Sequence, residues 1–297
     1  MLINNEFNEE KIQSPWQYAW SIFKRKNIAM TAMWVSILLI IITLSADFIV
    51  PHDASAQYVK VLLLPPYWME GGASTHILGT DDLGRDYLAL LIQGAKFTLN
   101  GALFITLTLS VLGTLIGATA ALTKGLKASI LHHLLDTLLI IPTLLTALIL
   151  VVKFGPSYQN SLIAVSLSLL PQFIRGIFLS IENELNKQYI IALRLDGATN
   201  LQLLRYGILP NIIEPIITLL SRIFTMAVLE ISTLGFLGLG TQHDKVELGA
   251  LIASSSDIIY SSPWQVFFPG LVIFIIISVF YIFTEGLRHA VLEGEEE

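Results

Sequence analysis

The sequence of 297 residues contains no cysteine. The chain therefore has no disulfide framework, no thiolate nucleophile and no cysteine-based metal site. It also lacks a phosphate-binding loop of the form G-x-x-x-x-G-K-[ST], the zinc motif H-E-x-x-H and the nucleophile elbow G-x-S-x-G. These absences predict a protein that is not an enzyme, with no metal site and no cofactor of its own.

Charged residues are also scarce. They make up 13% of the chain, whereas an ordinary soluble domain is about a quarter charged. Hydrophobic residues make up 54%, and the net charge of −6 provides no basic field for a nucleic-acid partner. This composition predicts a membrane protein whose principal surroundings are the lipid bilayer.

Six apolar runs are long enough to cross a bilayer as helices, because a hydrocarbon core about 30 Å thick needs about 20 helical residues. A helix also satisfies its own backbone hydrogen bonds where water is absent. We therefore expect an all-α polytopic membrane protein with six transmembrane helices, at residues 28–50, 97–122, 133–153, 160–180, 212–240 and 264–285.

The distribution of lysine and arginine predicts the orientation of these helices. Placing both termini in the cytoplasm puts eleven of the 17 basic residues on that side and five on the other, as the positive-inside rule requires. The expected segments are a cytoplasmic stretch 1–27, a periplasmic stretch 51–96, a core domain 97–285 with a cytoplasmic loop 181–211, and a cytoplasmic tail 286–297.

Two segments outside the spans have recognisable patterns. Residues 14–27 place Trp16, Trp20 and Phe23 at helical spacing before a basic cluster, which predicts either an amphipathic helix on the inner membrane surface or a simple anchor. The outer stretch LGTDDLGRD, 78–86, does not have the acid and glycine order of a calcium loop. We interpret it as a hydrogen-bonded structural turn made by Gly79, Asp81, Asp82, Gly84, Arg85 and Asp86.

Arg222 and Glu230 are ionisable residues inside the fifth expected span. Ionisable groups at membrane depth usually face a bundle interior or an aqueous path. At eight residues apart they differ by about 80° around a helix, so both can face one side. They either line a route for a polar substrate or bond to neighbouring helices.

Prolines and small residues predict local distortion and close packing within the spans. Pro142, Pro171 and Pro269 should kink their helices, since proline lacks a backbone donor. Gly113 and Gly117 form a small-xxx-small element that permits close helix approach.

The segment RLDGATNLQLLRYGILPN, 194–211, is a polar interruption between two apolar runs. We expect a helix over 181–196 that Gly197 ends, because glycine tolerates the left-handed conformation. Thr199 or Asn200 can cap a second helix, and Pro210 is expected to end it. Leu193, Leu201, Leu203 and Leu204 would give this projection an apolar surface for a soluble partner.

The same segment resembles the cytoplasmic EAA loop of bacterial ABC-importer permeases. In that pattern E-A-A-x-x-x-G is followed after nine residues by I-x-L-P, and here Gly197 precedes Leu209 and Pro210 at this spacing. Ile191, Leu193 and Gly207 depart from the pattern. The resemblance implies that the loop contacts an ATPase, through Ala192, Arg194, Asp196, Gly197, Ala198, Leu204, Leu209 and Pro210.

Other stretches are similar to the C-type subunit of dipeptide and oligopeptide permeases, and most of all to the SapC branch. They include LGTDDLGRDYLALLIQGAKFTL, LHHLLDTLLIIPTLL, LGFLGLG and SPWQVFFPGL. The resemblance implies the type I ABC-importer permease fold in the bacterial inner membrane. It also implies a second homologous permease, two cytoplasmic ATPases that use ATP, and a periplasmic solute-binding protein.

The implied function is a pore-forming subunit for peptides, antimicrobial peptides among them, or for another small cationic solute. Haem and polyamines are also substrates associated with this branch. An ion-driven transporter or channel is the alternative, and it predicts internal repeats and paired charges at the midplane. A membrane scaffold or sensor is a third possibility.

Overall fold

The computed structural model describes residues 15–49, 62–123, 126–241 and 246–295. Parts of the predicted segments 1–27, 51–96 and 286–297 therefore lie outside the described residues. Within the described ranges the chain is helical, with turns and one isolated bridge between Thr80 and Asp86. The α-helices are α1 (Pro15–Arg25), α2 (Asn27–Leu44), α3 (Ala46–Ile49), α4 (Tyr87–Leu122), α5 (Leu126–Leu138), α6 (Thr143–Phe154), α7 (Tyr158–Leu185), α8 (Gln188–Leu195), α9 (Asn200–Gln202), α10 (Ile213–Phe236), α11 (Leu248–Ser254) and α12 (Trp264–Glu295).

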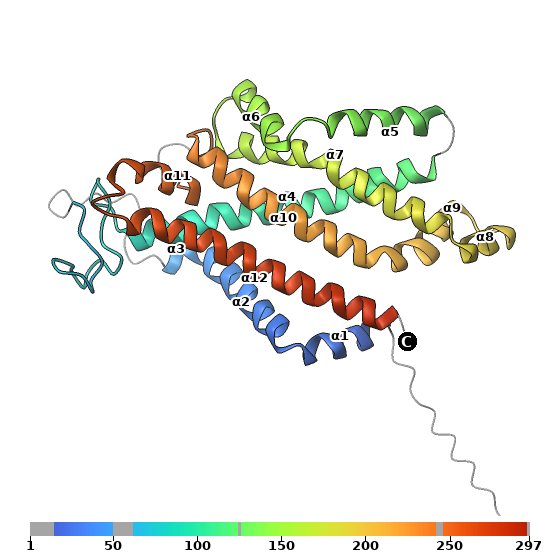
Figure 1. Ribbon diagram of the computed structural model, residues 1–297, viewed down its shortest axis with the longest axis horizontal. Helices are drawn as coiled ribbons and strands as arrows, with labels where there is room; N and C mark the ends of the chain where they lie inside the picture. Colours follow the sequence, from blue (N-terminus) through green and yellow to red (C-terminus); the bar gives the residue numbers. More distant parts are fainter. Residues whose placement is uncertain (1–14, 50–61, 124–125, 242–245, 296–297) are drawn as a thin grey trace, which may run out of the picture.

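The long helices α4, α7, α10 and α12 form an elongated bundle, with α2 lying along α12 (Figure 1). Helices α8 and α9 lie at one end, which we call the loop end, together with α1 and the last turns of α12. Residues 62–86 and α11 lie at the opposite end, which we call the cap end. The described parts of the N-terminal and C-terminal regions therefore share one end of the bundle.

Five helical segments have the length and hydropathy needed to cross a membrane. They are Asn27–Leu44, Tyr87–Leu122, Tyr158–Leu185, Asn200–Phe236 and Trp264–Gly294, and they correspond to the expected spans at 28–50, 97–122, 160–180, 212–240 and 264–285. Helix α4 begins at Tyr87 rather than residue 97, because the Asp86 carboxylate caps it by accepting from the Ala89 backbone N–H.

The prediction of one continuous third span at 133–153 is wrong. This stretch is divided between α5 and α6, which follow one another along the bundle (Figure 1). Pro142 lies directly before α6 with an extended backbone, φ −54° and ψ 132°. Proline also disfavours a helical conformation in the residue before it, so the expected kink is here a full interruption. Pro171 and Pro269 do remain inside α7 and α12.

Small residues allow α4 and α7 to pack closely. A Cβ atom added to Gly113 would lie 2.3 Å from Phe173, and one added to Gly117 would lie 2.8 Å from Ile177. Both contacts are too short for a side chain, and Phe173 and Ile177 are fully buried. The two glycines therefore serve helix packing, as their spacing predicted.

Helix α1 packs on α12 at the loop end. Phe23 is fully buried and meets Phe283 of α12 edge to face, whereas Trp20 on the same helix is 43% exposed. Lys26, directly after α1, forms an ion pair with Glu293 near the end of α12 at 2.9 Å. The predicted helix within 14–27 is thus present, with Ala19 and Ile22 buried as well as Phe23.

The turn at 78–86 is hydrogen-bonded, as its composition predicted. The Asp81 carboxylate accepts from the backbone N–H groups of Leu83 and Arg85 at 3.0 and 2.7 Å, and from Arg85 Nε at 2.7 Å. Gly79 and Gly84 have positive φ, at 81° and 73°. Gln265 in α12 donates to the Thr80 carbonyl at 3.0 Å, which holds the turn against the bundle.

Glu247, directly before α11, is a carboxylate with no exposed surface. Its Oε1 accepts from the Thr241 backbone N–H at 2.7 Å, while its Oε2 has no hydrogen-bond partner among the described residues. A Cβ atom at Gly235 or Gly240 would lie 2.7 or 2.6 Å from the carboxylate oxygens. Burial in this close space raises the pKa of Glu247 to about 7.

This pKa predicts that the protein is more stable in acid. Because the folded-state pKa lies above the ordinary value of 4.5, folding favours the protonated form. That contribution is complete below about pH 4.5 and is lost as the pH rises through 7. We expect the free energy of unfolding to fall by about 2 kcal/mol between pH 5 and pH 8 from this group, measured by thermal unfolding in detergent.

The matched control is Glu247→Gln, which keeps the oxygen that accepts from Thr241 but does not titrate. Its unfolding should show a shallower pH dependence than that of the unchanged protein. An equal slope for both proteins would contradict the role assigned to Glu247.

Candidate functional site

The candidate site has two parts, and the first is the loop at 181–211. Gly197 ends α8 with φ +87°, and the Ala198 N–H donates to the Leu193 carbonyl at 3.0 Å. An L-residue at Gly197 would be strained by its backbone conformation, although open space surrounds the position. The predicted glycine stop is confirmed.

A capping box starts the next helix. The Thr199 hydroxyl accepts from the Gln202 N–H, and Gln202 Oε1 accepts from the Thr199 N–H at 2.8 Å. Each side chain thus serves a backbone group of the other. Of the two predicted caps, Thr199 rather than Asn200 is the one used.

The predicted single helix over 181–196 is wrong. Helix α7 continues to Leu185, and α8 begins at Gln188. Lys187 between them has an extended backbone, with ψ 147°, and this changes the direction of the chain. The Lys187 ammonium group contacts the Glu184 carboxylate at 2.8 Å and so holds the bend to the end of α7.

Pro210 does not end the second helix, which corrects another prediction. Leu203–Ile208 is a π-helical turn, Leu209–Ile212 is a 3-10 turn, and α10 follows at Ile213. Pro210 lies at the start of the 3-10 turn, where the backbone donor that it lacks is not needed. The chain therefore remains helical from the loop into α10.

Much of the loop surface is apolar and exposed. Ile191, Leu195, Leu201 and Tyr206 are between 51% and 84% exposed. A cavity of about 350 Å³ lies among Leu193, Asp196, Gly197, Ala198, Gln202, Leu203 and Tyr206. The sequence analysis did not include Leu195 and Tyr206 in the apolar surface of the loop. Their large apolar side chains within a polar segment could have indicated that they belong to it.

Most of the predicted loop residues are accessible. Leu203 is the exception, because it is 1% exposed and belongs to the core. Eight loop residues were expected to contact an ATPase. Five of them are exposed, namely Ala192, Arg194, Asp196, Gly197 and Pro210, and three are partly buried, namely Ala198, Leu204 and Leu209.

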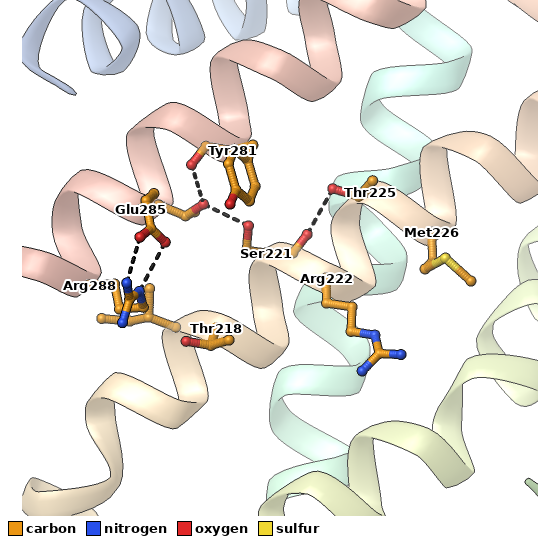
Figure 2. Close-up of a pocket in the computed structure, with 10 residues that line it drawn as sticks. Thr218, Ser221, Arg222, Thr225, Met226, Tyr281, Glu285 and Arg288 are labelled. Carbon is orange, nitrogen blue, oxygen red and sulfur yellow. Dashed lines mark hydrogen bonds and ion pairs between the residues drawn. The ribbon is translucent and has the colours of Figure 1, made fainter. Parts of the chain in front are cut away.

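The second part of the site is a cavity of about 320 Å³ between α10 and α12 (Figure 2). Its lining combines hydroxyl and charged groups with apolar side chains. The lining residues are Ile217, Thr218, Ser221, Arg222, Thr225 and Met226 of α10, and Tyr281, Thr284, Glu285 and Arg288 of α12. Such a mixture suits a ligand that has both polar and apolar parts.

Arg222 lines this cavity and is exposed. Figure 2 shows its side chain directed away from Glu285 and Arg288. With its amide oxygen turned toward Arg222, Gln172 of α7 accepts from Nε and Nη2 at 3.0 and 3.1 Å. This orientation satisfies both the oxygen and the nitrogen of the Gln172 amide. It leaves the Arg222 guanidinium group beside the cavity.

Glu230 is not brought together with Arg222. It is 4% exposed and is not among the residues that line the cavity. Its carboxylate accepts from the Thr143 hydroxyl at the start of α6 and from the Ser168 hydroxyl of α7 at 3.2 Å. Of the two predicted roles, these contacts support the second, in which Glu230 bonds to neighbouring helices.

An ion cluster at one side of the cavity was missed by the sequence analysis. Arg288 contacts Glu285, three residues before it in α12, through Nε at 2.9 Å and Nη2 at 2.6 Å. It also contacts Glu214 at the start of α10 at 3.3 Å. The i, i+3 spacing of Glu285 and Arg288 was a signal for the first pair, whereas the contact with α10 depends on tertiary structure.

Comparisons with known proteins agree with this architecture. Residues 112–292 match the family described as binding-protein-dependent transport system inner membrane component. Residues 14–66 match the N-terminal TM domain of oligopeptide transport permease C.

Two curated relatives illustrate the similarity. The chain is 38% identical over 296 residues to the peptide transport system permease protein SapC of Escherichia coli O6:H1, covering all of both chains. It is 36% identical to the dipeptide transport system permease protein DppC of Escherichia coli K12, covering 93% of this chain and 92% of that protein.

A solved structure shares the fold. An inward-facing form of the MetNI methionine ABC transporter contains a chain that matches 69% of this one, with a TM-score of 0.58 and 17% identity. The match covers 97% of that chain. At this identity the comparison concerns the fold alone.

The contacts of Glu230 predict a loss of stability on truncation. Glu230→Ala would leave the Thr143 and Ser168 hydroxyls without their acceptor, at a cost of roughly 2 kcal/mol. Glu230→Gln keeps one acceptor oxygen, so its thermal unfolding midpoint in detergent should lie between those of the unchanged protein and the alanine variant. A Glu230→Ala protein that unfolds at the unchanged temperature would contradict the role of Glu230 in joining α6, α7 and α10.

Proposed function

Because this chain belongs to the family of inner membrane components of binding-protein-dependent transport systems, we propose that it is the pore-forming subunit of an ATP-driven peptide importer. It is a multi-pass protein of the bacterial inner membrane, and its family is one of transport permeases rather than enzymes. The peptide transport permeases that match it over at least 92% of their length support peptides as the substrate class. Antimicrobial peptides fall within this proposal, and another small cationic solute is the second substrate class that we propose.

The loop end is proposed to face the cytoplasm and to bind an ATPase subunit. The observation that carries this proposal is the loop itself, in which Leu193 and Tyr206 are exposed and line a cavity of about 350 Å³. Exposed apolar side chains around a hollow are suited to helix or loop docking by a soluble protein. A second homologous permease, two ATPases and a periplasmic solute-binding protein would complete the complex.

The helical continuity between this loop and α10 supports a mechanical role. Movement of a bound ATPase would displace α8 and α9, and the π-helical and 3-10 turns connect these to α10. Six side chains of α10 line the cavity against α12. ATP-driven closure of the ATPases is therefore proposed to change the shape of this cavity.

The cavity between α10 and α12 is proposed to lie on the substrate route. Arg222 provides a cation for a peptide carboxylate, and Ile217 and Met226 provide apolar surface. Glu230 is proposed to support this route indirectly, by holding α10 against α6 and α7.

Gly197→Val is expected to uncouple the complex. Valine is strained at φ +87°, and the ending of α8 should be distorted. We expect peptide-stimulated ATPase activity of the complex in proteoliposomes to fall at least tenfold. The matched control is Gly238→Val, because Gly238 has φ +72° and open surroundings but lies two residues after the end of α10, at the opposite end of that helix from the loop. Equal coupling in both variants would refute the assignment of the loop.

Arg222→Ala is expected to reduce peptide uptake by the reconstituted complex about tenfold without changing recovery of its subunits. Arg222→Lys keeps the charge but not the planar donor pair, so its uptake should be intermediate. Uptake that is unchanged in Arg222→Ala would remove Arg222 from the substrate route. Uptake by the chain without ATPases would instead favour an ion-driven transporter.

A further inference from the structure

The Tyr189 hydroxyl lies where three helical elements meet at the loop end. Tyr189 belongs to α8, and its hydroxyl contacts the Glu184 carboxylate of α7. The same hydroxyl lies 2.9 Å from the Gly207 carbonyl of the π-helical turn and 3.0 Å from Asn211 Nδ2. Asn211 Nδ2 also donates to the Gly207 carbonyl at 2.7 Å. One phenol group thus joins α7, α8 and the 3-10 turn that precedes α10.

Counting donors assigns the direction of these hydrogen bonds. A tyrosine hydroxyl has one proton and can also accept. The charge-assisted bond to Glu184 is the stronger use of that proton. Asn211, with two amide protons, then donates one to the Tyr189 oxygen and one to the Gly207 carbonyl. Every group in the set has a partner when Glu184 is ionised.

The contact of this set with Gly207 in the π-helical turn gives it mechanical significance. A π-helical turn replaces the i→i−4 hydrogen bonds of an α-helix and leaves a local weak point, often at functional sites. Here a Cβ atom on Gly207 would lie 3.0 Å from Ile190 and 3.4 Å from Leu193, so α8 lies close against the turn. The polar set and this packing hold the weak point in one arrangement.

We propose that Tyr189 and Asn211 are positioning residues, which form a latch that makes α8 and the start of α10 move as one body. Glu184 anchors the latch to α7. The acidic side chain at the base of the loop therefore comes from α7, seven residues before Ile191, where the EAA pattern has its glutamate. The role in transport rests on the proposed function, whereas the mechanical connection is a property of this chain alone.

The absence of cysteine allows a direct test of the mechanical connection. Cysteines introduced at Leu195 in α8 and Leu229 in α10, both exposed, provide two sites for spin labels. We expect a narrow distance distribution by double electron–electron resonance in the purified full chain. Tyr189→Phe should broaden it at least twofold, because the ring remains and the hydroxyl is lost.

Three further variants make this test specific. Asn211→Ala should broaden the distribution to the same extent, and the double variant should add little, since both residues belong to the same chain of hydrogen bonds between Glu184 and the Gly207 carbonyl. Glu184→Gln keeps an oxygen that can accept from Tyr189, so this variant should retain the narrow distribution. Tyr260→Phe removes the hydroxyl of a fully exposed tyrosine near α11 and should have no effect. A narrow distribution in Tyr189→Phe would overturn the latch.

The complex tests the role in transport. In proteoliposomes, Tyr189→Phe is expected to lower peptide uptake per ATP hydrolysed about fivefold, with unchanged copurification of the ATPases. Unchanged uptake per ATP would overturn the transport role of the latch. Failure of the unaltered chain to bind any ATPase would instead refute the proposed function, and the spin-label result would still stand for or against the latch.

Discussion

A backbone N–H or C=O group without a partner costs several kcal/mol in a bilayer, and the helices of this protein are arranged around that cost. Where the helical pattern is interrupted, polar side chains from neighbouring elements form additional hydrogen bonds. The break before α6 brings Glu230 of α10 to the Thr143 hydroxyl at the start of that helix. At the π-helical turn before α10, Asn211 donates to the Gly207 carbonyl and to the Tyr189 hydroxyl of α8. Both irregularities are thus also places where helices are joined.

The second of these joints connects the two parts of the candidate site. The loop end has exposed apolar side chains, and α10 provides six of the ten residues that line the cavity. Between them the chain stays helical, through a π-helical and a 3-10 turn. A rigid connection of this kind is suited to transmitting movement, whereas a flexible loop would absorb it. The proposed coupling of ATP hydrolysis to transport depends on this continuity.

Local signals in the sequence predicted several features because their causes are local. Gly197 ends α8 and Thr199 caps α9, since both act through neighbouring backbone groups. The prediction failed where the effect of a residue depends on its surroundings. Pro142 interrupts a span and Pro171 does not, although each was predicted to kink a helix. Pro210 is accommodated because a change of helical pattern precedes it.

The sequence by itself determined five of the six expected spans, the cap turn at 78–86 and the position of the loop, because hydrophobic length and turn chemistry are properties of short segments. Tertiary structure decided that Arg222 lines a cavity while Glu230 joins three helices, since eight residues of spacing do not say which neighbours a helix face meets. It also decided that Glu184, Tyr189 and Asn211 meet at Gly207. Side chains from separate helices meet only after the helices have packed.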